Sequence, residues 1–554
     1  VMHDLIHDLA QYISGGEYYQ IEKEKQECSL VERVRHMSLC DPRNEDGEVM
    51  TRFLSHPRTK AMRTLLVMRA HEISWTDVSA KLRFHGGLVP HVEFLRALSL
   101  SGVKIGELPD SIGNLKHLRY LNLEFTDISI LPESVFRLYH LQTLLLEGCV
   151  HLESLSKDVG KLSNLRCLTV RKDHTGGVDV VRMPSDIGRL TSLRTLDVLN
   201  VGGREEDCGV QALEGLTHLR GRLEILNLQN VLKADHARLA DLKGKRKLKE
   251  LLLCWSGDPV CSSGPASPDV QTKVLENLRP PNHLIILEVY EYGGLAFPSW
   301  MGDDPSPFSK LTHVVIGWCP NMSALPPLGL LPSLRHLRIH GFDAMEALGA
   351  EFRGFGARVA FPALVELEFH HMEGCRAWQG VERGDFPLLK RLSIVSFPKL
   401  ESIVPLYILP ALEVLDLFKC GRLASLKFQG GGPHSSSPSG PPPLREIHIS
   451  MCPLLCFSGE DDQQLPSTLR DLRISSDCPL LVDWCRTEAG RNLAHVPGAR
   501  FWRDRGGRCF VSTTKPEVRN GELQVDFIPI LDDPSGDNGS APGHVVEDKG
   551  NMEL

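Results

Sequence analysis

Apolar residues recur along this chain in a six-residue pattern, L-x-x-L-x-L, at nearly constant spacing. In the most regular stretch the triplets are Leu95/Leu98/Leu100, Leu118/Leu121/Leu123, Leu141/Leu144/Leu146 and Leu165/Leu168/Val170. Their middle residues are 23, 23 and 24 positions apart. The last two apolar residues of each triplet alternate with polar residues, which predicts a short strand with one face turned inward. The strands are followed by segments such as Leu108-Pro109…Ile112-Gly113, in which proline blocks further pairing and glycine permits a tight bend.

A period of roughly 20–29 residues with this pattern is typical of leucine-rich repeats, in which each repeat buries its leucines only against its neighbours. The predicted fold class is therefore α/β, a leucine-rich-repeat solenoid shaped as a horseshoe with a parallel sheet on its concave face. Further triplets extend the array from Val34/Met37/Leu39 to Leu469/Leu472/Ile474, which predicts a repeat domain over residues 28–500. Wider gaps predict inserted loops near residues 172–181, 256–268 and 429–443.

The composition of the chain gives no indication of a nucleic-acid partner or of a membrane span. The chain has 554 residues, a formal net charge of −8 and a pI near 6.3, so no basic footprint for nucleic acid is expected. No apolar run is long enough to span a bilayer, which predicts a soluble protein without a membrane span. Because the sequence begins with Val1 rather than methionine, we expect a fragment of a longer protein.

The fifteen cysteines are placed in a way that favours free thiols. Four of them lie three residues after the last inward residue of a triplet, where leucine-rich repeats bury a small side chain: Cys149, Cys319, Cys420 and Cys452. We therefore predict buried free thiols rather than disulfides. The remaining Cys spacings lack a paired C-x-x-C with matching histidines, so no metal site is predicted.

The first seventeen residues, VMHDLIHDLAQYISGGE, carry apolar residues at helical spacing, which predicts a helix that ends at Gly15-Gly16. His3 and His7 flank Asp4 as in a zinc-binding H-E-x-x-H helix, but aspartate is shorter than the catalytic glutamate and no third ligand is evident. The plain alternative is a packed helix whose polar side carries these groups.

The stretch MHDLIHDLA also resembles the M-H-D motif that closes the winged-helix part of the nucleotide-binding region in plant intracellular immune receptors. The resemblance implies that His3 lies near the phosphates of bound nucleotide and helps to hold the ADP-bound resting state, with Asp4 as its motif partner. Residues 1–27 would then be the helical remnant of that winged-helix domain.

Several later stretches are similar to consecutive repeats of the coiled-coil class of nucleotide-binding leucine-rich-repeat receptors. They include LRGRLEILNLQNV, ADHARLADLKGKRKLKELLLCWS and LPPLGLLPSLRHLRI, and the resemblance covers residues 1–497. It implies a cytoplasmic sensor, with the nucleus or a membrane surface left open. In that family the repeats bind a pathogen effector or a guarded host protein and fold back on a nucleotide-binding region. ADP or ATP is implied for the full-length parent and no cofactor for this chain.

The chain has no G-x-x-x-x-G-K-[ST] phosphate loop and no G-x-S-x-G elbow, so it is predicted not to be an enzyme. ATP binding or hydrolysis is expected only of the parent. What remains is the outward face of the strands. Each outward residue alone is explained by solvation of the sheet, but as a continuous array they favour a protein-binding surface. The outward residues predicted to bind a partner are Tyr120, Asn122, Glu124, Thr195, Asp197, Glu288, Tyr290, His336, Arg338, His340, Glu366, Glu368, His370, Arg391, Glu446, His448, Asp471 and Arg473.

Four tryptophans, Trp255, Trp300, Trp318 and Trp378, follow strands or lie between them, and we expect them to pack in the core or against loops. Residues 501–554 lack triplets and end in an acidic, Gly/Ser/Pro-bearing segment, which predicts a largely disordered extension. Two alternatives remain open: a substrate-selecting adaptor for ubiquitylation, which would carry an F-box-like helical region, and a cell-surface receptor ectodomain, which would need a signal peptide and disulfide caps.

Overall fold

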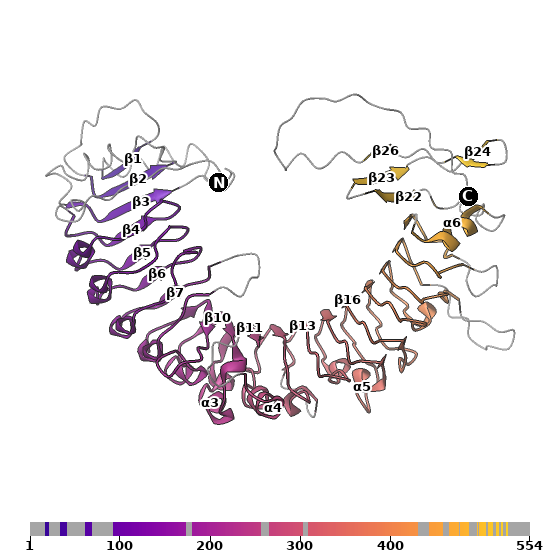
Figure 1. Cartoon of the computed structure of the whole chain (residues 1–554), viewed down its shortest axis with the longest axis horizontal. Coiled ribbons are helices and arrows are strands. Elements are labelled where there is room, and N and C mark those ends of the chain that lie inside the picture. The colour runs from indigo at the N-terminus through magenta and orange to yellow at the C-terminus, as the bar shows by residue number, and fades with distance from the viewer. Residues whose placement is uncertain are drawn as a thin grey trace.

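The computed structural model describes residues 17–21, 34–40, 61–68, 92–172, 180–255, 265–302, 308–429, 442–457, 465–475, 477–486, 496, 498–505, 508–512, 517–519, 522–524 and 528–529. These residues form an open arc in which one short strand per repeat lines the inner side and turns or short helices line the outer side (Figure 1). The predicted leucine-rich-repeat solenoid is confirmed.

The strands of the arc form two sheets, with every neighbouring pair parallel as far as β22. The first sheet contains β1 (Tyr18–Ile21), β2 (His36–Cys40), β3 (Thr64–Met68), β4 (Ala97–Leu100), β5 (Tyr120–Asn122), β6 (Thr143–Leu145), β7 (Cys167–Thr169) and β8 (Thr195–Leu196). The second begins with β9 (Val198–Asn200), β10 (Arg220–Leu226), β11 (Lys247–Cys254), β12 (Ile286–Tyr290), β13 (His313–Gly317) and β14 (His336–His340). It continues with β16 (Glu366–His370), β18 (Arg391–Val395), β19 (Val414–Phe418), β20 (Glu446–Ser450), β21 (Asp471–Ser475), β22 (Gly498–Arg505), β23 (Arg508–Ser512) and β26 (Ile528–Pro529).

The outer side is built from small elements that leave room for the arc to curve. The early repeats use 3₁₀ turns: η2 (Asp110–Asn114), η3 (Glu133–Arg137), η4 (Lys157–Lys161), η5 (Ser185–Arg189) and η6 (Val210–Gly215). Later repeats use α3 (Ala234–Leu239), α4 (Pro268–Asn277), α5 (Ala350–Arg353) and α6 (Pro479–Arg486). The two-stranded pairs are β15 (Ala347–Leu348) with β17 (Ala377–Trp378), and β24 (Glu517–Arg519) with β25 (Glu522–Gln524).

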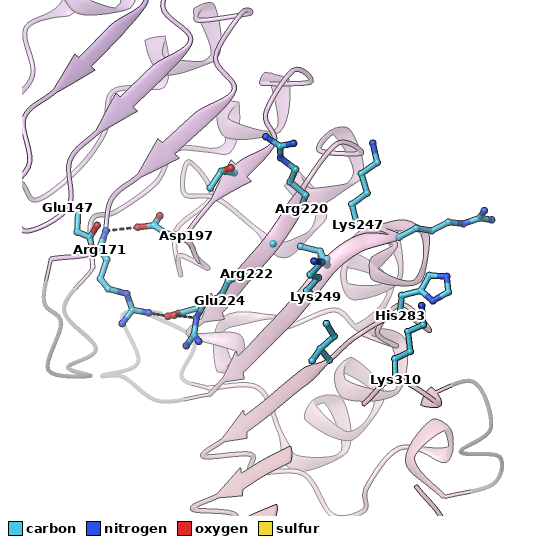
Figure 2. Close-up of a pocket in the computed structure, with 15 residues that line it drawn as sticks. Glu147, Arg171, Asp197, Arg220, Arg222, Glu224, Lys247, Lys249, His283 and Lys310 are labelled. Atoms are coloured by element: carbon cyan, nitrogen blue, oxygen red, sulfur yellow. Dashed lines mark hydrogen bonds and ion pairs between the residues drawn. The ribbon is translucent and has the colours of Figure 1, made fainter. Parts of the chain in front are cut away.

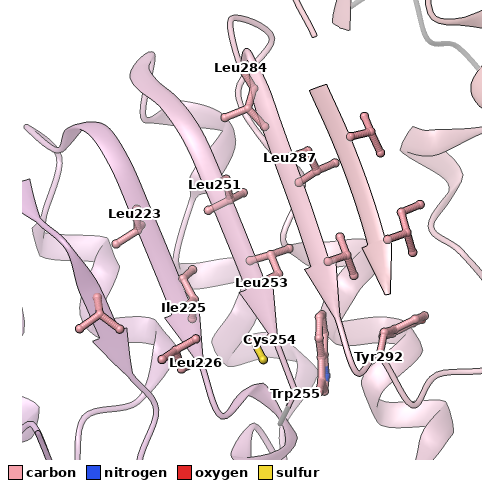
Figure 3. Close-up of a cluster of buried hydrophobic side chains, with 14 of the residues drawn as sticks. Leu223, Ile225, Leu226, Leu251, Leu253, Cys254, Trp255, Leu284, Leu287 and Tyr292 are labelled. Carbon is pink, nitrogen blue, oxygen red and sulfur yellow. The ribbon is translucent and has the colours of Figure 1, made fainter. Parts of the chain in front are cut away.

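The inward residues of the triplets make one continuous core. Leu121, Leu144 and Leu168 are fully buried and lie at matching register positions of adjacent strands. Around β10–β12, Leu223, Leu251 and Leu287 continue this row (Figure 3). Each fully buried leucine gains about 1.5–3 kcal/mol relative to exposure, and only because the neighbouring repeat covers it.

The glycine of the I-G turn has a different role from the predicted one. A Cβ on Gly113 would lie 2.8 Å from the Cβ of Ser134 in the next repeat, and one on Gly160 would lie 2.9 Å from the carbonyl oxygen of Asp186. Neither glycine is among the residues with positive φ. Glycine is needed here for close approach of successive 3₁₀ turns, rather than for a bend.

The prediction of buried free thiols is confirmed for Cys149, Cys319, Cys420 and Cys452. Each thiol satisfies a turn carbonyl; the Sγ of Cys149, for example, donates to the carbonyl of Leu123 at 3.0 Å. Burial raises the pKa of the Cys319 thiol to about 12, so it is neutral and unreactive at physiological pH.

The repeat array reaches past both predicted boundaries. At its start, β1 lies inside the segment 1–27 that was assigned to a winged-helix remnant, and it pairs with β2 of the first predicted repeat. At its end, β22 pairs in parallel with β21, with Ala499 and Phe501 opposite Leu472 and Ile474. Buried Val496 completes this triplet, which the sequence hides because alanine replaces the middle leucine. The extension expected to be largely disordered also contains β23–β26, where β23 turns antiparallel to β22. Residues 1–16 and 530–554 lie outside the described part.

Candidate protein-interaction surface on the concave face

The residues predicted to bind a partner lie along or just beyond the concave strands, and register brings many of them together. His336, Glu366 and Arg391 occupy one row across β14, β16 and β18, and Glu446 and Asp471 continue it on β20 and β21. Arg338 and Glu368 lie in the next row. His3 and Asp4 lie outside the described residues, so their predicted contact with nucleotide stays a prediction.

Many of these outward side chains form a ladder of charges across repeats. Arg338 donates to Glu368, and His336 Nδ1 lies 2.9 Å from Glu366 Oε2. Hydrogen bonding with His370 and Arg338 lowers the pKa of Glu368 to about 2, so this carboxyl is ionised at physiological pH. The ladder fixes long side chains in place, which lowers the entropy that a binding partner must remove.

Asp416 belongs to the same ladder and was missed from the sequence. Its carboxylate accepts from Arg391 Nη1 at 2.7 Å and lies 2.7 Å from His448 Nδ1, so it joins three consecutive strands. The alternation Val414-Leu415-Asp416-Leu417 already marks it as an outward residue between two buried leucines. A strict reading of the period-2 pattern would have found it.

Two predicted residues have mainly structural contacts. Asn122 is 7% exposed and its amide donates to Glu124 Oε2 at 2.9 Å, while its Oδ1 accepts from the Glu124 backbone N–H. This arrangement holds Glu124 at the end of β5 and leaves little of Asn122 for a partner. The side chain of Asp197 likewise is turned toward the backbone of neighbouring residues.

Asp197 lies where the first sheet ends and the second begins. Its side chain accepts from the backbone N–H groups of Val170 and Arg171 at 2.9 and 3.1 Å, whereas its own carbonyl accepts from the N–H of Glu224 at 3.0 Å. Asp197 therefore joins β7 on one side to β10 on the other. We call this boundary between the first and second sheets the seam, and the ion pair between Arg171 and Glu224 also crosses it (Figure 2). Burial raises the pKa of the Asp197 carboxyl to about 6, against the effect of these hydrogen bonds.

In many repeats the residue two positions after the triplet adopts a left-handed backbone. In ten repeats its φ lies between 53° and 73°, at Gly102, Phe125, Gly148, Glu291, Trp318, Gly341, His371, Ser396, Lys419 and Met451. Its N–H donates to the next repeat; that of Trp318, for example, donates to the carbonyl of His340 at 2.7 Å. This turn suits glycine, and a bulky residue there costs roughly 1–2 kcal/mol. Strain at such a residue is a reason to look for function there.

Trp318 is the most conspicuous of these residues: of the two expected places, the core and the loops, it lies outside the core and its indole stacks on the turn residue His371. Trp255, Trp300 and Trp378 are at most 4% exposed, as expected, whereas Trp318 is 46% exposed. The left-handed turn directs its indole along the surface instead of into the core, where its neighbour Cys319 lies. The sequence signal was available, because Gly148 and Gly341 hold the equivalent position in other repeats.

Trp318 is the centre of an aromatic patch formed with Tyr290, His340 and His371. Its ring lies 5.6 Å from that of His371 in a stacked arrangement and 5.6 Å from that of His340 edge-on; Tyr290 lies 5.7 Å from His340. Burial, helped by the nearby His370 and Arg338, lowers the pKa of His340 to about 4. The imidazole of His340 is therefore neutral at physiological pH, and the aromatic patch lies beside the charged ladder.

Gly341 makes room for this patch, which gives a prediction. A Cβ on Gly341 would lie 2.5 Å from the Trp318 indole, and its φ of +71° is strained for any other residue. We expect Gly341→Ala to lower the free energy of unfolding by about 1–2 kcal/mol and to displace the indole. Tryptophan fluorescence and urea unfolding measure both effects, with Gly106→Ala as the control because nothing lies within 4 Å of its Cβ. An unchanged emission spectrum would contradict the proposed contact.

Comparisons with known proteins agree with this fold. A family model described as a leucine-rich repeat region matches residues 87–428, more than half of the chain. A putative disease resistance protein of Arabidopsis thaliana is 35% identical over 476 residues, which are 83% of this chain and 30% of that protein. The putative disease resistance RPP13-like protein 1 of the same plant is 34% identical and is covered over 40% of its length, with 76% of this chain. The putative disease resistance protein RGA4 of Solanum bulbocastanum is 36% identical, with 62% of this chain and 33% of that protein covered.

Among solved structures, the leucine-rich-repeat protein LIC12759 of Leptospira interrogans covers 87% of this chain and 93% of its own, with a TM-score of 0.39 and 16% identity. The plant peptide hormone receptor RGFR1 in complex with RGF2 covers 88% of this chain and 92% of its own, with a TM-score of 0.29 and 14% identity.

The repeat period, the parallel concave sheet and the family match together define a leucine-rich-repeat protein, a fold that typically serves protein interaction rather than catalysis. The chain belongs to this leucine-rich-repeat family, and the relatives it matches are plant disease resistance proteins, at 34–36% identity. It spans 30–40% of the length of these three relatives. Within the described residues, none of the helices is long and apolar enough to cross a membrane.

Proposed function

We propose that this chain is the sensing part of a plant immune receptor, whose concave face binds a pathogen effector or a guarded host protein in the cytoplasm. The same array restrains an ADP/ATP-switched nucleotide-binding region of the full-length protein, to which His3 and Asp4 contribute. The observation that carries this proposal is the exposed, left-handed Trp318 at the centre of the aromatic patch.

The aromatic patch has the physical properties of a binding hot spot. Tryptophan and tyrosine carry much of the energy in protein interfaces because they bury a large area with few rotatable bonds. The left-handed turn and the two imidazole rings hold the indole in place before a partner arrives, which lowers the entropic cost of binding. The charged ladder beside it supplies a polar rim that fixes orientation.

Release of the nucleotide-binding region follows from linkage. A ligand shifts the receptor between resting and active states only by its difference in affinity for the two. If the concave face is more accessible in the active state, occupation of the aromatic patch stabilises that state.

The test begins with a split-luciferase screen of the full chain against secreted pathogen proteins and host proteins. For each protein that binds, the affinity is then measured with the wild-type chain and with the Trp318→Gly variant. Glycine already occupies the equivalent position at Gly148 and Gly341, so the change removes the indole without straining the backbone. We expect at least a thirtyfold loss of affinity, the equivalent of about 2 kcal/mol.

The matched control is Phe355→Ala, which removes an aromatic ring that is 83% exposed and lies beyond α5, away from the concave strands. It should leave the affinity unchanged. A second variant, Arg338→Glu with Glu368→Arg, keeps the internal ion pair but reverses its polarity on the face. Ligands that bind Trp318→Gly and this swapped variant as well as the wild type would refute recognition by the concave face.

A further inference from the structure

A hollow of about 1150 Å³ opens on the concave side at the seam between the two sheets (Figure 2). It lies where β10 and β11, the longest of the strands up to β21, begin earlier in their repeats than their neighbours do. Gly221 lies in its wall, and a Cβ added there would meet nothing within 4 Å. The hollow is therefore open space and not a packing defect filled by side chains.

The charged groups around the hollow fall into two sets. On the side of the seam, Arg171 and Arg222 both pair with Glu224. The other basic or titratable side chains that line the hollow form a set that we name the basic rim: Arg220, Arg246, Lys247, Lys249, His283 and Lys310. Within the described part of the chain, no carboxylate lies within ion-pair distance of these six side chains.

The repeats hold the rim cations in a regular row. Lys247, His283 and Lys310 each precede the first leucine of their triplet, so three consecutive repeats present a basic or titratable group at the same position. Arg220 lies directly opposite Lys247 in the parallel register, an arrangement that like charges make unfavourable. A register shift between Gly221 and Arg222 leaves Lys249 without an opposite residue on β10. This unfavourable arrangement would be compensated by an anionic ligand.

We propose that the basic rim binds an extended acidic segment of the partner protein, a second contact at the opposite ends of the strands from the aromatic patch. The proposal rests on the proposed function, since it names a further chemistry of the same ligand. The row runs from β10 to β13, three strand spacings or about 14 Å. That length exceeds a single phosphate and matches an extended peptide, whose alternate side chains repeat every ~7 Å on one side.

The character of the rim also favours a peptide over a compact polyphosphate. All six side chains are exposed, and three of them are lysines, which act as hydrated point charges rather than as forks that enclose one phosphate. Such a surface steers an acidic segment into place and depends strongly on salt.

The experiment uses the full chain and a fluorescein-labelled twelve-residue peptide of alternating glutamate and serine, followed by fluorescence anisotropy at 50 and 200 mM NaCl. We expect Lys247→Glu/Lys310→Glu to weaken binding at least tenfold, and Lys247→Gln/Lys310→Gln to weaken it less. The control Lys243→Glu/Lys273→Glu changes the net charge equally, but on exposed residues of η8 (Leu242–Gly244) and α4 on the outer side, and should stay within twofold of wild type.

Other outcomes would overturn the proposal. Equal losses in the rim and control variants would mean that the peptide binds through net charge alone. Displacement of the peptide by inorganic tripolyphosphate at a lower concentration than by unlabelled peptide would identify a small polyanion as the ligand. Trp318→Gly should bind the peptide like wild type, so a failure of the aromatic patch and a failure of the basic rim are told apart.

Discussion

Replacing Asp385 with alanine should lower the free energy of unfolding by about 3–5 kcal/mol, the largest loss that we expect from a single polar side chain in this protein. Asp385 is 1% exposed and accepts three hydrogen bonds: from Arg353 Nε at 2.8 Å, from the Ala360 N–H at 2.7 Å and from the Glu382 N–H at 2.8 Å. Alanine removes all three acceptors and leaves the buried guanidinium of Arg353 without its main partner.

The loss would spread to the neighbouring aromatic core. Asp385 and Ala360 directly precede Phe386 and Phe361, whose rings stack at 4.5 Å between adjacent repeats. Because repeat arrays unfold in units rather than all at once, urea unfolding should be combined with hydrogen exchange over residues 350–400. Buried Trp378, 6.0 Å from Phe386, gives a local fluorescence signal.

Glu382 provides the control for this prediction. It also pairs with Arg353, at 2.8 Å, but its side chain is 69% exposed. Glu382→Ala should therefore cost about 1 kcal/mol or less. Equal effects of the two alanine variants would show that burial of Asp385 is not the cause of the loss.

The periodic part of the fold could be predicted because its cause is local. Leucine at fixed spacing in β4–β7 reports a buried row directly, since each repeat has the same neighbours. The leucine pattern is weaker at β22, where the sequence has Ala499 at the position of a leucine. Only the pairing of β22 with β21 reveals this repeat. The start of the array at β1 was missed for a similar reason, because YYQI lacks the triplet.

The candidate site was predicted less completely, because side-chain direction depends on neighbouring repeats. The run KGKRKLKE is visibly basic, yet Lys245 is buried and donates to the carbonyls of Leu213 and Leu216, while Lys247 and Lys249 line the hollow. The side-chain directions of Trp318 and Asp197 also could not be predicted from the sequence. The tryptophan was expected in the core or against a loop and is half exposed, whereas the aspartate was expected to face a partner and instead accepts from backbone N–H groups.

Asp197 leads to the second prediction of large effect: the stability of wild type relative to Asp197→Asn should depend strongly on pH. Its folded pKa of about 6 lies above the ordinary value of 3.8, so between these values the folded state binds more protons than the unfolded state. The free energy of unfolding therefore falls as pH rises through this window. The stabilisation that the protonated Asp197 carboxyl contributes to the free energy of unfolding is fully present below pH 4. It is lost above pH 6, a change of about 3 kcal/mol.

Asparagine is the informative substitution because it resembles the protonated carboxyl. Its side-chain carbonyl can still accept from the N–H groups of Val170 and Arg171, whereas it carries no charge to desolvate beside Glu147. We expect the two proteins to be similar in stability near pH 4 and the variant to be more stable by up to about 3 kcal/mol at pH 7. Urea unfolding at steps between pH 4 and pH 7 measures this difference, in which the titration of all other groups cancels.

Amide exchange at Val170 and Arg171 distinguishes a local from a general effect. If the carboxylate joins the two sheets, these amides in the wild type should exchange less readily at pH 5 than at pH 7 after correction for intrinsic rates, and those in Asp197→Asn should show no such change. Parallel stability profiles for the two proteins would mean that Asp197 titrates normally and that the seam is held by the Arg171–Glu224 ion pair instead. A confirmed profile would make the seam the place where mild acidification stiffens the arc beside the hollow.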